Sequence, residues 1–63
     1  MIDVLNLAYS CLIDGGTEAD HMTVEDAAIT LENWKAEGWK EIEGITPEEF
    51  AAAWNEVADY FNR

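Results

Sequence analysis

Hydrophobic residues recur at helical spacing in separate stretches of the chain, with polar residues filling the positions between them. The last stretch shows the pattern best, because its apolar and polar residues fall on opposite faces of a helix with about 3.6 residues per turn. The apolar face carries Phe50, Trp54, Val57, Ala58 and Phe61, and the polar face carries Glu48, Asn55, Glu56 and Asp59. Taken together, the stretches predict helices at about residues 2–14, 23–37 and 47–62.

The third helix has four independent start signals within six residues. Thr46 is suited to the N-cap and Pro47 to the first helical position, while Glu49 stands where a capping box places its acid. Ile45 and Phe50 occupy the two positions of a hydrophobic staple. We therefore expect this helix to begin at Pro47.

The second helix has a comparable start and a clear end. Thr23 is the expected N-cap, with Asp26 three residues later. Gly38 is placed to end the helix in a Schellman motif, in which Trp39 would contact Trp34. Residues 39–45 then place an apolar residue at every third position, which leaves an extended segment and a turn of 3₁₀ helix both open. We predict an all-α fold, a compact three-helix domain of residues 1–63 with a short irregular or extended connector between helices two and three.

The first helix is apolar except for one narrow polar stripe, made by Asp3, Asn6, Ser10 and Asp14. A single neighbouring helix cannot cover so much apolar surface. Either this helix lies centrally, covered by both other helices, or it offers a spare flank to a second copy or a partner. That flank would consist of Ile2, Tyr9 and Ile13.

Helix two also has one apolar residue in an unexpected place. Its inward face is predicted to hold Val24, Ala27, Ala28, Leu31 and Trp34. Ile29 falls instead among the outward polar residues Glu25, Asp26, Glu32, Asn33 and Glu37. A lone exposed or loop-covered isoleucine is ordinary, whereas an apolar anchor ringed by acids is typical of a binding face.

The chain has fourteen acidic and three basic residues, for a net charge of -11. A net charge of about 2 to 8 keeps a small domain soluble, so the excess indicates either a cationic partner or unusual salt conditions. Direct binding to nucleic acid is disfavoured, since Lys and Arg make the phosphate contacts. We predict a cytoplasmic protein without a membrane span. Cys11 is the only cysteine and is expected to be buried, which agrees with a reducing compartment. The sequence has no apolar stretch long enough to cross a membrane, and its N-terminus lacks the basic residues of a signal peptide.

No catalytic or cofactor motif is present, and we predict neither an enzyme nor a cofactor. Ser10 is the only serine and His21 the only histidine, and they are far apart in sequence. The acidic loop Asp14–His21 lacks the residue order of an EF-hand, so no metal site is expected there. We expect His21 to be a surface residue.

Carboxylates at i,i+3 and i,i+4 on a helix lie about 5 to 6 Å apart, similar to phosphates along one nucleic-acid strand. A rigid pair of acidic helices can therefore occupy a cationic nucleic-acid groove on another protein. The predicted partner-binding residues are Glu25, Asp26, Ile29, Glu32, Glu37, Glu48, Glu49, Glu56 and Asp59. Glu18, Asp20 and Tyr60 are further contributors in this interpretation.

The chain resembles very small acidic proteins encoded by bacteriophages and mobile elements. The resemblance rests on the acidic pattern of the whole chain, the Gly38-Trp39 break and the helix start Thr46-Pro47-Glu48-Glu49-Phe50. The resemblance is to inhibitors of host defence, in particular anti-CRISPR proteins that act on type I effector complexes. It implies a non-enzymatic inhibitor in the host bacterial cell, bound where the complex recognises target DNA or its PAM, or bound to the recruited nuclease.

A second function class remains open. The chain could be a structural or regulatory interaction module, such as a homodimerising phage accessory protein or an antitoxin-like partner, that uses the apolar surface of helix one. Mimicry predicts binding that weakens strongly with salt, whereas the module predicts weak salt dependence. Both a monomer and a homodimer are compatible with the sequence.

Overall fold

The computed structural model describes residues 3–14 and 20–62. Three α-helices and one turn of 3₁₀ helix make up the fold: α1 (Val4–Asp14), α2 (Val24–Ala36), η1 (Lys40–Ile42) and α3 (Pro47–Phe61). The all-α prediction is confirmed. Of the two conformations left open for the connector, its central part adopts the 3₁₀ turn.

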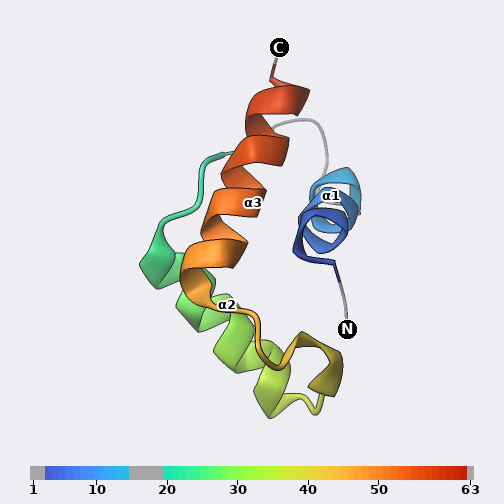
Figure 1. Cartoon of the computed structure of the whole chain (residues 1–63), viewed down its shortest axis with the longest axis vertical. Helices are drawn as coiled ribbons and strands as arrows, with labels where there is room; N and C mark the ends of the chain where they lie inside the picture. Colours follow the sequence, from blue (N-terminus) through green and yellow to red (C-terminus); the bar gives the residue numbers. More distant parts are fainter. Residues whose placement is uncertain (1–2, 15–19, 63) are drawn as a thin grey trace.

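The third helix lies at the centre of the molecule. Figure 1 shows α1 and α2 on different sides of α3, and α1 and α2 have no Cα atoms within 8 Å of each other. Of the two arrangements left open for helix one, the central position covered by both other helices is therefore wrong, and the helix instead has an exposed flank. Periodicity showed correctly that α1 has more apolar surface than one neighbour covers, and the surplus is exposed: Leu5 and Tyr9 are each 43% exposed and Ile13 is 52% exposed.

The buried residues form two clusters, which meet α3 at different points along its length. The larger cluster joins α2, the connector and α3 to one residue of α1, and consists of Leu7, Ala27, Leu31, Ile42, Ile45, Phe50 and Ala51. The smaller cluster joins α1 to α3 and consists of Ala8, Leu12, Ala53, Val57 and Ala58. Phe50 and Ile42 are fully buried, so the larger cluster contains the bulkiest part of the core.

Both threonine N-caps are confirmed. The Thr23 hydroxyl accepts a hydrogen bond from the backbone N–H of Asp26 at 3.1 Å, and the Thr46 hydroxyl accepts one from Glu49 at 3.1 Å. Pro47 is at the helix start, as predicted. Each cap satisfies a backbone donor that the first turn of a helix leaves without a partner.

The Schellman ending of α2 is also confirmed. Gly38 has a φ of +94°, its N–H donates to the Lys35 carbonyl at 3.0 Å, and the Trp39 N–H donates to the Trp34 carbonyl at 3.1 Å. The Trp34 and Trp39 ring centroids are 5.1 Å apart, and Trp34 and Phe50 are 5.6 Å apart. This helix end therefore brings both tryptophans against the core, in the edge-to-face geometry that aromatic pairs prefer.

Four residues differ from their predicted burial. Val24, predicted to face inward, is 47% exposed, and Phe61 is 39% exposed. Each belongs to a terminal turn of its helix, where the neighbouring helix no longer covers it. Asn55, placed on the outward face, is half-buried because the segment before α2 crosses it, and Cys11 is half-buried rather than buried. Ile2, part of the predicted flank, lies outside the described residues.

Candidate binding surfaces

All nine residues predicted to bind a partner are exposed. Helical periodicity arranges the four on α3 in pairs: Glu49 and Glu56 are seven residues apart and share a face, as do Glu48 and Asp59, which are eleven apart. The carboxylates on α2 follow the side of that helix opposite its buried residues, Ala27 and Leu31. The structure thus places acidic faces on two different helices.

Ile29 is 58% exposed, so no described part of the chain covers it. Three acidic residues are its neighbours on the helix surface, because they lie three or four positions away along the helix: Glu25, Asp26 and Glu32. An apolar side chain surrounded by exposed carboxylates therefore projects from the outer face of α2. This exposure fits both an ordinary exposed isoleucine and the anchor ringed by acids, and only a covering loop among the described residues is ruled out.

Few cations offset these acids. Within residues 3–14 and 20–62 the basic side chains are Lys35 and Lys40, and the one ion pair joins His21 Nε2 to Asp59 Oδ1 at 2.6 Å. Asp59 is thus the only predicted partner-binding carboxylate with an ionisable partner in that part of the chain. The others face solvent, where they remain available to an external cation.

The contacts that hold the segment before α2 against α3 were not predicted from the sequence. Asn55 Oδ1 accepts the Met22 N–H at 2.6 Å, and Asn55 Nδ2 donates to the Met22 carbonyl at 3.0 Å. Trp54 Nε1 donates to the Asp20 carbonyl at 2.9 Å. Together with the His21–Asp59 pair, these bonds attach residues 20–22 to α3, and they therefore hold the N-terminal end of α2 next to α3.

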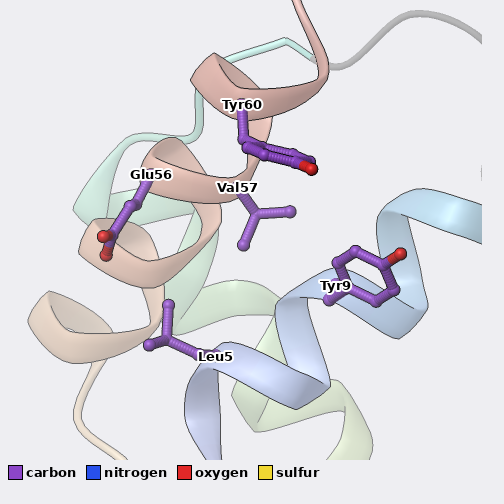
Figure 2. A pocket seen from close by; sticks show the side chains of 5 residues that line it. All are labelled: Leu5, Tyr9, Glu56, Val57 and Tyr60. Atoms are coloured by element: carbon purple, nitrogen blue, oxygen red, sulfur yellow. The ribbon is translucent and has the colours of Figure 1, made fainter.

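A second surface lies between α1 and α3. Leu5 and Tyr9 from α1 face Glu56, Val57 and Tyr60 from α3 across an open groove of about 310 Å³ (Figure 2). Tyr60 is 63% exposed, so this side chain forms an accessible wall of the groove. Of the five lining residues only Glu56 is charged, and the site is otherwise apolar or aromatic.

The groove continues the spare flank that the sequence indicated on helix one. Exposed apolar residues recur at every fourth position of α1 and form one stripe along this helix: Leu5, Tyr9 and Ile13. In the middle of this stripe, the centroid of the Tyr9 ring lies 5.4 Å from that of Phe61 on α3. The α3 wall was not foreseen, because Tyr60 was considered only as part of the acidic surface.

Among the described residues no group of His, Cys, Asp and Glu side chains could hold a metal ion. Glu18 and most of the acidic loop, residues 15–19, lie outside the described residues. None of the helices described combines the length and the apolar character that crossing a bilayer requires. No protein-family model, curated protein or solved structure matches this chain. The described fold and surfaces define a small all-α protein with exposed acidic helix faces and an apolar groove.

Proposed function

We propose that this protein is a non-enzymatic inhibitor that binds, through its acidic surface, a cationic nucleic-acid-binding site on another protein. The observation that carries the proposal is the exposure of the carboxylates on α2 and α3, which are almost without cationic partners in residues 3–14 and 20–62. Carboxylates without a partner attract an external cationic surface, and their mutual repulsion is relieved when it binds.

The partner is a component of a host defence complex, and a type I CRISPR effector is the specific candidate. This step rests on the resemblance to small acidic anti-CRISPR proteins. In such a complex the inhibitor occupies the positively charged site that recognises target DNA. Helix carboxylates about 5 to 6 Å apart take the places of successive phosphates, and the target DNA is then excluded by competition.

The test is displacement of labelled target DNA from a purified type I effector complex, measured at low and at high salt. We compare two matched double variants, each of which neutralises two glutamates. Glu25→Gln with Glu32→Gln alters the outer face of α2, while Glu41→Gln with Glu43→Gln alters the connector. We expect the α2 variant to need about 10-fold more protein for half-displacement, and the connector variant to match the wild type.

Salt dependence provides an independent result from the same assay. Raising the salt from low to physiological concentration should weaken displacement steeply, because contacts between exposed charges are screened over about 8 to 10 Å. If the wild-type chain fails to displace DNA at low salt, or if both double variants lose the same activity, binding through the α2 face is rejected.

The exposed stripe on α1 supports the alternative, an interaction module that works through apolar contacts. For that class, neutralising Glu25 and Glu32 leaves partner binding unchanged, and added salt weakens it little. Loss of binding would instead follow substitution of Tyr9 or Ile13. Loss of partner binding in the Glu25→Gln/Glu32→Gln variant therefore supports the acidic inhibitor, whereas loss of partner binding after substitution of Tyr9 or Ile13 supports the interaction module.

A further inference from the structure

The groove between α1 and α3 has a defined chemical lining. It is lined by Leu5, Tyr9, Val57 and Tyr60, and Glu56 stands at its edge on α3 with its carboxylate directed away from Tyr9 (Figure 2). Its volume of about 310 Å³ is at the lower limit of pockets that bind whole small molecules, roughly 300 to 1,000 Å³. An open groove of this size is suited to one or two anchoring side chains of a larger partner.

The shape of the apolar surface matches a helix. The exposed stripe of Leu5, Tyr9 and Ile13 spans about 12 Å along α1 at 1.5 Å per residue. Two turns of a bound helix span about 11 Å, so side chains at i, i+3, i+4 and i+7 of a partner can follow this stripe. An extended peptide has no sheet edge to pair with in the described part of the chain, where every regular element is helical.

The charge of the protein selects among the possible partners. Glu56 lines the groove, so a carboxylate borders the apolar surface. A second copy would bring another chain of net charge -11 against this carboxylate and the acidic surface around it, and like charges in contact oppose association. A helix with an apolar face bordered by Lys and Arg satisfies both the groove and its border.

We propose that the α1–α3 groove binds a basic amphipathic helix, with apolar side chains of that helix between Leu5 and Tyr60 and a cation on Glu56. This inference rests on the proposed function in that it specifies the element that the cationic partner presents. It adds an apolar contact that phosphate mimicry lacks. Binding at the groove therefore persists in part at salt concentrations that abolish contacts made by charge alone.

The probe is a fluorescein-labelled amphipathic Leu/Lys peptide about five helical turns long. Its control is a scrambled peptide of the same composition, which has the same charge but no continuous apolar face. Fluorescence anisotropy at physiological salt gives both dissociation constants. We expect the amphipathic peptide to bind about 10-fold more tightly than the scrambled peptide; equal affinities would overturn the proposal.

Three alanine variants locate the binding. Leu5→Ala and Tyr60→Ala each remove one wall of the groove and should abolish most of the preference for the amphipathic peptide. Val24→Ala removes an exposed apolar side chain from α2, outside the predicted partner-binding residues, and should leave the preference unchanged. Circular dichroism checks that each variant is folded. If Val24→Ala loses as much preference as Leu5→Ala, the contact is not in the groove.

Two further measurements separate the possible failures. Sedimentation equilibrium of the wild-type chain tests the competing occupant: a dimer that Leu5→Ala dissociates would assign the groove to a second copy and overturn the peptide proposal. The Glu25→Gln/Glu32→Gln variant retains the groove and should retain the peptide preference. Failure of the wild-type chain to displace DNA, with that preference intact, would reject the proposed inhibition and leave the groove assignment supported.

Discussion

The two sides of α3 are built differently. On the α2 side, polar and aromatic side chains make specific contacts. Asn55 bonds both backbone groups of Met22, and Trp54 donates to the Asp20 carbonyl. Phe50 lies between two tryptophans, with ring centroids 5.6 Å from Trp34 and 5.9 Å from Trp54. Directional bonds and edge-to-face rings permit few alternative arrangements.

On the α1 side, small and aliphatic side chains make most of the buried contact. Ala8 and Leu12 from α1 pack against Ala53, Val57 and Ala58 from α3. Such contacts are not directional, and volume rather than geometry governs them. Beside this narrow strip Leu5 and Tyr9 remain 43% exposed.

This difference separates a side that fixes the fold from a side that is available for binding. Polar networks whose members are all satisfied favour one arrangement of a core, whereas a small apolar interface can adjust. The groove lies on the side with the small apolar interface. Four substitutions test the comparison, and they follow in order of decreasing effect on stability.

Phe50→Ala should have the largest effect. Phe50 is fully buried at the centre of the aromatic cluster, and truncation of a buried phenylalanine costs about 3–5 kcal/mol. For so small a domain this is a large part of the free energy of unfolding. Urea denaturation followed by circular dichroism measures the loss. Phe61→Ala, on the same helix but 39% exposed, is the matched control and should cost about 1–2 kcal/mol; equal losses would contradict the placement of the core.

Asn55→Ala removes the link between α3 and the segment before α2. It leaves the Met22 N–H and carbonyl without their side-chain partners, which should cost about 1–3 kcal/mol of the free energy of unfolding. Hydrogen exchange at the Met22 amide should also accelerate. Glu56→Ala is the control, because Glu56 is the next residue along α3 and is exposed; this substitution should change the free energy of unfolding by about 0.5 kcal/mol or less. Unchanged exchange at Met22 would show that these bonds do not hold the segment.

Gly38→Ala tests the end of α2 without altering packing. A Cβ at Gly38 would meet no atom within 4 Å, but the φ of +94° is strained for any L side chain. We expect a loss of about 1 kcal/mol in urea denaturation. Gly38→Asn should lose less, because asparagine tolerates this conformation better than alanine. A loss as large for Asn as for Ala would point to a cause other than the backbone.

The ends of the helices could be predicted because their signals are local. Thr23 and Thr46 each bond a backbone N–H three residues away, and the Gly38 motif spans six residues. A short stretch of sequence contains every group that takes part. The same holds for the contact of Trp34 with Trp39, which follows once the Schellman motif is recognised.

The arrangement of the helices could not be predicted in the same way. Periodicity shows how much apolar surface a helix has, but not which neighbour covers it, so the sequence left a central α1 and an α1 with an exposed flank both open, and it did not indicate that α3 lies at the centre. The bonds from Trp54 to Asp20 and from Asn55 to Met22 join residues more than thirty positions apart. No local pattern marks such a pair. The groove likewise needs both helices to be placed before Leu5 and Tyr60 can be recognised as opposite walls.

Leu5→Ala should have the smallest effect of the four, with a loss of about 0.5 kcal/mol or less in the free energy of unfolding. Leu5 is 43% exposed, and alanine favours the helix at least as well. Leu7→Ala is the control, since Leu7 lies two residues away on α1 and is 5% exposed; a buried leucine costs about 2–5 kcal/mol when truncated. Urea denaturation compares the two. If Leu5→Ala were as costly as Leu7→Ala, Leu5 would belong to the core, and its effect on peptide binding would reflect loss of structure rather than loss of a groove wall.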